Sequence, residues 1–243
     1  MMSETAAAHD SNRYQRLAGR KPGSPGPAPA LDGAARLQRQ FEVIFAANRD
    51  AFRDARVLDL MSSTGFWSLA ALDAGARHIV GVEPATGQIE AAKRAFAEYG
   101  VDAKSYRFMN SEPQAAMRSF DPGAFDVVLC HGYFEQADPR VFFAQLARLE
   151  VKRAILDTRI SLGKGPIVRA RRRAADEIKG KTSRYNSILS VPNHELITFF
   201  CDYFKYRWRL INGKEVALSD WTGLGDYKQD QRRTYLLERA ASD

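Results

Sequence analysis

The sequence contains little cysteine and little histidine, which limits the metal and redox chemistry that it can support. Its 243 residues include only two cysteines, Cys130 and Cys201, and four histidines. Two cysteines cannot build a disulfide framework, and no Cys or His pair has the short spacing of a structural zinc site. We therefore expect reduced, buried thiols and no structural zinc.

Long apolar runs are also missing. No segment approaches the roughly 20 apolar residues that a membrane span requires. The stretch 1–10 carries acidic side chains and no hydrophobic core segment, which is not typical of a secretory signal. We therefore expect a cytoplasmic protein without a membrane span.

A third missing feature is the G-x-G-x-x-G pattern that binds the pyrophosphate of a dinucleotide. The stretch 56–83 nevertheless has the order of a nucleoside-binding βαβ unit. An apolar run at 56–61 is followed by the small residues Ser62, Ser63 and Thr64, then by a helical segment and a second apolar run that ends at Glu83. This combination favours a cofactor that has a ribose but no phosphates.

Apolar runs alternate with helical periodicity along most of the chain. Strands are predicted at 56–61, 78–83, 104–109, 125–130, 151–158, 205–211 and 233–239. Helices are predicted at 31–52, 65–75, 87–99, 113–119, 138–149 and 193–204. The pattern predicts an α/β fold, namely a doubly wound, mostly parallel seven-stranded sheet with helices on both faces and an antiparallel C-terminal hairpin strand.

Two segments depart from this alternation. Residues 1–30 are rich in Pro and Gly and bury too little apolar surface to order themselves, so we expect a flexible tail. Two roles stay open for this tail, an inert leader or a cover that closes over a ligand through Tyr14. Residues 31–243 are then a single domain, with a basic insertion or lid at about 160–192.

Positive charge gathers in that insertion. The chain has a net charge of +7, and its isoelectric point is near 9.5. The basic residues of the insertion are Lys164, Arg169, Arg171, Arg172, Arg173, Lys179, Lys181 and Arg184. They are able to bind a phosphate or carboxylate of a substrate, or to form an ordinary solvated surface.

The alternation, the acids that end the first two strands and the terminal hairpin resemble the class I S-adenosylmethionine-dependent methyltransferases, most of all bacterial small-molecule and sugar O-methyltransferases. The resemblance covers about 35–240. In that family an acid is followed by three alternating glycines. Here the motif is Asp59-x-Met61-x-Ser63-x-Gly65, which keeps only the last glycine.

The resemblance implies S-adenosylmethionine as the cofactor and assigns several residues to it. The turn after the first strand would support its methionine part, and Asp59 would help to hold its amino group. Glu83 ends the second strand and would accept both ribose hydroxyls; the alternative is that Glu83 only caps the next helix. The full set of expected cofactor-binding residues is Asp59, Met61, Ser62, Thr64, Gly65, Glu83, Pro84, Asn110 and Cys130.

The residues after the fourth strand bear on the acceptor. Methyltransferases of exocyclic base amines usually carry Asn/Asp-Pro-Pro-aromatic there, whereas this chain has Cys130-His131-Gly132-Tyr133-Phe134-Glu135. The difference argues against base-amine methylation and favours a hydroxyl acceptor.

A hydroxyl acceptor requires a group that removes its proton, which contributes about 100- to 10,000-fold in rate. His131, at the carboxyl end of the fourth strand, is the first candidate, unless it only shapes the pocket. His194, which follows the predicted N-cap Asn193, is the second. Asp157 ends the fifth strand and has two open roles. It assists a base, or it joins Glu135 in holding a divalent cation such as Mg²⁺.

The leading hypothesis is therefore an O-methyltransferase that acts on a small molecule, either a carbohydrate or an anionic metabolite. An RNA methyltransferase is the second, supported by the basic charge but not by any RNA-binding module or interleaved aromatics. The third is a silent fold that binds the cofactor or a partner protein. The sequence leaves the oligomeric state open.

Overall fold

The computed structural model describes residues 31–173, 188–218 and 220–240. The tail predicted at 1–30 lies outside the described residues, as do Lys179, Lys181 and Arg184 of the basic insertion. Among the described helices, none combines the length and the apolar character that crossing a bilayer would demand.

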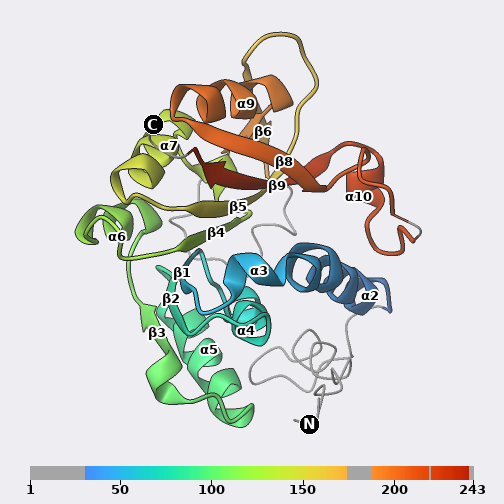
Figure 1. Cartoon of the computed structure of the whole chain (residues 1–243). Helices are drawn as coiled ribbons and strands as arrows, with labels where there is room; N and C mark the ends of the chain where they lie inside the picture. Colours follow the sequence, from blue (N-terminus) through green and yellow to red (C-terminus); the bar gives the residue numbers. More distant parts are fainter. Residues whose placement is uncertain (1–30, 174–187, 219, 241–243) are drawn as a thin grey trace, which may run out of the picture.

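Seven strands form one sheet in the order β3-β2-β1-β4-β5-β9-β8 (Figure 1). They are β1 (Arg56–Leu60), β2 (His78–Val82), β3 (Tyr106–Met109), β4 (Val127–His131), β5 (Arg153–Arg159), β8 (Tyr206–Asn212) and β9 (Arg232–Arg239). The first five strands are parallel, and β9 lies antiparallel between β5 and β8. The predicted α/β fold with an antiparallel C-terminal hairpin is confirmed.

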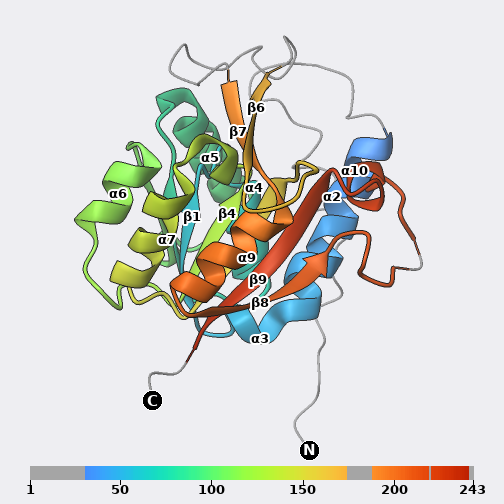
Figure 2. The same cartoon turned by 90° about the horizontal axis from the view of Figure 1, so that it is seen from above.

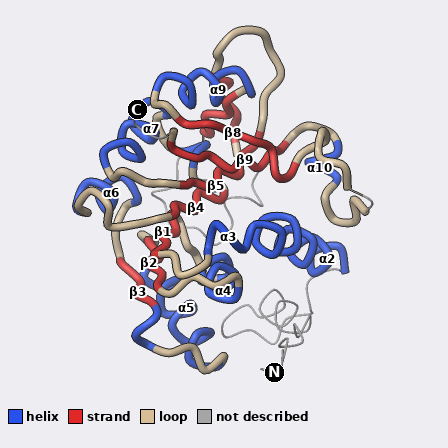
Figure 3. The backbone as a smooth tube through the Cα atoms, viewed as in Figure 1, coloured by secondary structure: helices blue, strands red, loops and turns tan. Residues whose placement is uncertain are grey.

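Helices cover both faces of this sheet (Figure 3), because the strands bury side chains on both sides. One face packs on α6 (Pro113–Ser119), α7 (Pro139–Arg148) and α9 (His194–Tyr203). The other packs on the π-helix η1 (Phe41–Phe45), which continues α2 (Leu31–Gln40), and on α3 (Arg49–Phe52) and α4 (Phe66–Asp73). In addition, α5 (Thr86–Glu98) packs on β3 through Phe96, whose ring meets those of Tyr106 and Phe108.

The helix predicted at 31–52 is divided into several pieces. After α2, the chain continues as the π-helix η1, a 3₁₀ turn η2 (Ala46–Asn48) and α3. The Asn48 side chain donates to the carbonyls of Val43 and Ile44 at 2.9 and 3.0 Å. These bonds satisfy carbonyl groups where the winding of the helix changes, so the division has a local hydrogen-bonding cause.

The basic insertion contains two strands that the sequence pattern does not predict. β6 (Val168–Arg172) and β7 (Ile188–Pro192) pair as an antiparallel hairpin that projects from the rest of the domain in Figure 2. Asn193, the predicted N-cap of α9, accepts from the Leu196 N–H and also donates to the Gly165 carbonyl at 2.7 Å, which fixes the base of the hairpin. Of the two strands, only β7 buries apolar residues, Leu189 and Val191. The alternation of apolar and polar residues is therefore too short to recognise in the sequence.

Candidate cofactor and acid–base site

The order of the strands places the candidate site at the carboxyl ends of β1 and β4. β1 pairs with β2 on one side and with β4 on the other. The chain therefore leaves these two strands in opposite directions, and this divergence is where open α/β sheets bind ligands. The predicted residues of the first turn and His131 flank this point.

The turn after β1 has an alternating left-handed backbone. Met61, Ser63 and Gly65 have φ values of 61°, 51° and 76°. These are the three positions at which the resembling family has glycine. A non-glycine residue costs roughly 1–2 kcal/mol in this conformation, so Met61 and Ser63 are held in it by the surrounding structure. The backbone shape of the motif is kept although two of its glycines are not.

Gly65 is the one position in this turn where a side chain would collide with its neighbours. A Cβ there would lie 2.9 Å from Phe96 Cε2 and 3.0 Å from Phe108 Cζ. Gly81 on β2 faces the same ring, with a Cβ distance of 2.6 Å to Phe108 Cδ1. Two glycines therefore let the turn and β2 pack closely against α5 and β3.

Glu83 lies in the interior beside this turn and is only 1% exposed. Its Oε2 accepts from the Ser63 N–H at 3.1 Å, and its Oε1 accepts from the Ala85 N–H at 2.9 Å. The second bond is a local contact at the entry to α5, as the helix-cap alternative requires. The first joins the end of β2 to the turn after β1, so Glu83 organises both walls of the predicted nucleoside site.

Asp59 is the second buried acid, and it lies within the first strand. It accepts a hydrogen bond from the Ser68 hydroxyl of α4 at 2.6 Å. Burial raises the pKa of Asp59, the charge of Glu83 adds to the rise and the Ser68 bond opposes it, so that the pKa is about 7. Among the described residues, this desolvated carboxyl group has no ion-pair partner. Its role in receiving the amino group of the cofactor stays a prediction.

The other predicted cofactor residues have mixed environments. Ser62 is buried, and its Oγ has no hydrogen-bond partner among the described residues. Asn110 is exposed and donates to the Pro84 carbonyl at 2.9 Å, which fastens the loop after β2. The Cys130 side chain is fully buried in the core, and burial raises the pKa of its thiol.

Asp157 is the centre of a buried polar cluster on the face of α2 and α4. It is a direct neighbour of His131 on β4 and of Thr234 on β9. Its carboxylate accepts from the hydroxyls of Tyr227 and Thr234 and pairs with the Arg232 guanidinium. Burial alone would raise the pKa of Asp157. Its partners, of which Arg232 has the largest effect, lower this pKa to about 2. Asp157 is thus an ionised carboxylate and not a proton acceptor.

His131 is the member of the cluster that is able to accept a proton. Its Nε2 lies 3.3 Å from Asp157 Oδ1, its ring is 24% exposed, and the ring of Trp67 on α4 lies 4.7 Å away. The pKa of His131 is lowered to about 4. Burial is the largest cause, the charge of Arg232 lowers the pKa further, and the charge of Asp157 opposes the shift. The ring is therefore neutral at pH 7. The negative charge of Asp157 favours a proton on Nε2, which leaves Nδ1 as the basic nitrogen.

The predicted cation site at Glu135 and Asp157 is not supported. Glu135 is 2% exposed and accepts from both the backbone N–H and the guanidinium of Arg159, each at 2.9 Å. Arg232 pairs with Asp157 and also lies 3.8 Å from Glu135. Arginines thus occupy the positions that a cation would take. In the described ranges, no group of three or more metal-binding side chains is present.

His194 lies on the other face of the sheet from His131. Its Nδ1 is 2.9 Å from the Tyr235 hydroxyl, and its ring stacks on Tyr235 and meets the edge of Trp208. Tyr235 belongs to the core beneath α7 and α9, whereas its neighbour Thr234 faces Asp157. The structure therefore does not bring the second predicted base to the cluster.

Several residues of the cluster are absent from the sequence-based prediction. Gln40 donates to the Tyr227 hydroxyl at 2.7 Å, and its amide lies 3.5 Å from His131 Nε2. Gln40 is a polar residue on the apolar stripe of its helix, beside Phe41 and Ile44, and this is a recognisable signal. Tyr227 and Arg232 carry no such signal, because they reach Asp157 only through long-range pairing.

Part of the chain is similar to a known protein family. Residues 57–151 match the family model described as a methyltransferase domain. No curated protein matches the sequence. The matched segment begins in β1 and ends just before β5, and it contains the turn, Glu83 and His131.

Solved structures extend the similarity over most of the chain. The N-terminal domain of EvdMO1 with SAH bound is 17% identical, with a TM-score of 0.64 over 96% of this chain and 98% of that one. Magnesium protoporphyrin IX methyltransferase (ChlM) from Synechocystis PCC 6803 with bound SAM is 13% identical, with a TM-score of 0.57 over 96% and 92%. YcgJ from Bacillus subtilis is 14% identical, with a TM-score of 0.57 over 86% and 99%.

The fold is therefore the Rossmann-like α/β fold of the class I methyltransferases. Together with the matched domain, it supports S-adenosylmethionine-dependent methyltransferase activity.

Proposed function

We propose that this protein transfers the methyl group of S-adenosylmethionine to a hydroxyl of a small molecule, either a sugar or an anionic metabolite. The observation that carries the proposal is the His131–Asp157 pair, 3.3 Å apart, at the edge of the sheet where the first turn and Glu83 also lie. A neutral histidine with an ionised carboxylate behind it is suited to removing a proton from a hydroxyl.

In this proposal the left-handed turn and two acids bind the cofactor. Glu83 receives the ribose hydroxyls, Asp59 receives the amino group, and the backbone from Met61 to Gly65 supports the methionine part. When bound, the cofactor supplies an electrophilic methyl group. The protein then needs only to align the acceptor and remove its proton.

Proton removal falls to His131. With Nε2–H directed at Asp157, Nδ1 accepts the acceptor's proton. The ring then becomes an imidazolium beside a carboxylate that stays ionised, and Asp157 stabilises that charge. Asp157 itself is held in place by Tyr227, Thr234 and Arg232, so it is a positioning residue.

The charges around His131 favour an uncharged reacting group. The cluster contains the arginines Arg36, Arg159 and Arg232 and the acids Glu135, Asp157 and Asp226. Each arginine is paired with one of these acids. Among the residues that the structure describes, no excess positive charge is therefore left for an anion near His131. An anionic part of the acceptor would have to lie further out, towards the arginines of β6.

Turnover with labelled S-adenosylmethionine across a panel of sugars, sugar phosphates and hydroxy acids tests this function. We expect His131→Asn to lose turnover while retaining cofactor affinity. His78→Asn is the matched control, because His78 is at the amino end of β2, on the opposite edge of the sheet. Equal activity in the His131 variant and the wild type would refute His131 as the base. Failure of the wild-type protein to bind S-adenosylmethionine would refute the proposed function.

An RNA acceptor is the second candidate, because exposed arginines lie on β6. Binding to mixed RNA at about 150 mM salt separates the two, since non-specific phosphate contacts weaken steeply with salt. Affinity that persists there would favour RNA.

A further inference from the structure

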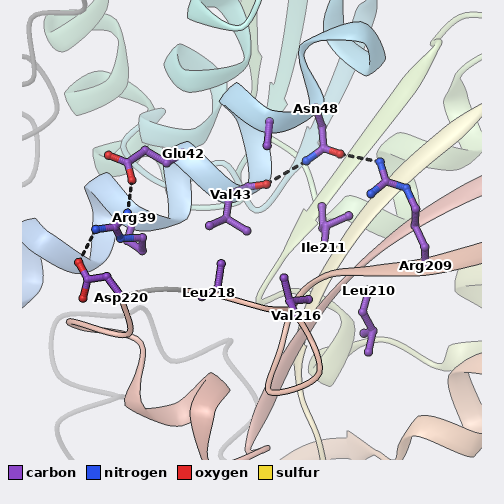
Figure 4. A pocket seen from close by; sticks show the side chains of 11 residues that line it. Arg39, Glu42, Val43, Asn48, Arg209, Leu210, Ile211, Val216, Leu218 and Asp220 are labelled. Carbon is purple, nitrogen blue, oxygen red and sulfur yellow. Dashed lines mark hydrogen bonds and ion pairs between the residues drawn. The ribbon is translucent and has the colours of Figure 1, made fainter.

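A second hollow lies apart from the proposed catalytic edge. It has a volume of about 350 Å³ and lies between η1, η2 and β8, together with the chain that follows β8 (Figure 4). None of the residues that line it belongs to the proposed cofactor or acid–base set. The volume is at the lower end of the range of ligand pockets, so it suits a small molecule.

The middle of this cavity is aliphatic. Val43 comes from η1, Ile211 from β8, and Val216 and Leu218 from the chain after β8. Their side chains face one another across the hollow in Figure 4. Among the described residues, no aromatic ring lines it. The surface therefore fits a flexible hydrocarbon chain better than a flat ring.

The two polar ends of the cavity differ in charge. At one end, Arg39 is neutralised by Glu42 at 2.6 Å and by Asp220. At the other end, Arg209 donates to the side-chain oxygen of Asn48 at 2.7 Å. Within the described part of the chain, Arg209 has no carboxylate partner. Its end of the cavity is therefore positive.

The orientation of Asn48, the partner of Arg209, is also fixed. The Asn48 amide nitrogen is bound to the carbonyls of Val43 and Ile44, so its oxygen points towards β8. A guanidinium has five N–H donors, and this amide oxygen takes one of them. The remaining donors suit a carboxylate, which Arg binds through two parallel hydrogen bonds.

We propose that this cavity binds a small aliphatic carboxylate. The hydrocarbon chain lies on Val43, Ile211, Val216 and Leu218, and the carboxylate is bound by Arg209. The site is separate from the proposed methyl transfer and does not depend on it.

Isothermal titration of the full-length protein with octanoate, without the methyl donor, tests the proposal. Octanamide has the same chain without the charge. We expect octanoate to bind in a saturable way, and to bind at least about tenfold more tightly than octanamide, because a hydrogen bond to a charged group contributes about that much.

Three variants locate the site. Arg209→Gln removes the charge, and Ala47→Phe narrows the mouth of the cavity from an exposed position. Each should weaken octanoate binding about tenfold or more. Arg207→Gln is the matched control, because it removes the same charge from the same strand at an exposed position outside the lining.

Binding that is lost in the first two variants and kept in the third supports the proposal. No saturable octanoate binding, equal affinity for octanamide, or unchanged affinity in Arg209→Gln and Ala47→Phe would each overturn it. Melting temperatures of the three variants, compared with the wild type, show that a loss of binding is not a loss of fold.

Discussion

His131 and Asp157 are register neighbours on two adjacent parallel strands, and His131 Nε2 lies 3.3 Å from Asp157 Oδ1. Because directly paired residues project from the same face of a sheet, the fold brings an imidazole and a carboxylate together without any loop. The pair lies on two inner strands of the sheet, and a site on strands holds its geometry more precisely than a site on loops.

The first prediction concerns His131. His131→Gln removes the base but keeps a polar side chain of similar reach. We expect turnover on the identified hydroxyl acceptor to fall about 100- to 10,000-fold, because a general base contributes about that much. Cofactor affinity, measured by titration, should stay unchanged. Parallel losses of turnover and affinity would show instead that His131 binds the cofactor.

The second prediction concerns Asp157 and stability. Asp157→Asn leaves the buried Arg232 without its carboxylate, and removing one partner of a buried pair costs about 3–5 kcal/mol. We expect a loss of that order in the free energy of unfolding, measured with urea. Asp50→Asn, whose side chain is 87% exposed and paired only at the surface, should change it by less than about 1 kcal/mol. Similar effects in the two variants would contradict the role given to the cluster.

The third prediction concerns Glu83. Glu83→Gln keeps the shape of the side chain but loses the charge that would strengthen two hydrogen bonds to a ribose. We expect S-adenosylmethionine to bind about 100-fold more weakly, which corresponds to about 3 kcal/mol. Glu90→Gln, on the exposed face of α5, is the control and should bind normally. Normal affinity in the Glu83 variant would exclude the ribose role.

The fourth prediction concerns the left-handed turn. Ser63 has a φ of 51°, which a glycine adopts without strain. Ser63→Gly should raise the free energy of unfolding by about 0.5–1 kcal/mol, because relief of strain exceeds the added entropy of the unfolded chain. Ala97→Gly, at an exposed helical position in α5, should lower it by about 1 kcal/mol. A lower free energy of unfolding in both variants would show that the turn is not strained.

The fifth prediction concerns pH and Asp59. The pKa of Asp59 rises from 3.8 in the unfolded chain to about 7 in the folded protein. Between these values the folded state binds more protons than the unfolded state, so stability falls as pH rises. The loss is complete above the folded pKa, and a shift of this size corresponds to about 4 kcal/mol.

Asp59→Asn removes this titration. The melting temperature of the variant should therefore exceed that of the wild type by more at about pH 8 than at about pH 5. A difference that does not change with pH would contradict the raised pKa. Asp54→Asn, at an exposed position before β1, is the control and should show no such widening.

Local patterns located most of the elements. The apolar run predicted as a strand at 56–61 is β1 at Arg56–Leu60, and the helix predicted at 113–119 is α6 at Pro113–Ser119. These segments were predictable because burial on a sheet or on one side of a helix imposes its own period on the sequence. The strands β6 and β7 were not, because their pairing buries apolar residues on only one strand.

The candidate site was also predictable from the sequence only in part. The turn from Asp59 to Gly65, Glu83 and the position of His131 are adjacent to strand ends, so the order of the elements along the chain was enough to place them at one edge. The sequence also left His194 as the second candidate base, and a cation held by Glu135 and Asp157 as one of two roles for Asp157. Those alternatives depend on distances that local patterns do not contain.

The sequence by itself determined the α/β alternation, the acids at the ends of the first two strands and the histidine after the fourth. Only the tertiary structure decided that Asp157 faces His131 together with Tyr227, Thr234 and Arg232, and that His194 lies on the other face. The reason is physical. Hydrophobic periodicity is set by neighbours a few residues apart, whereas the charge and orientation of a buried carboxylate are set by strands and helices that meet it from far along the chain.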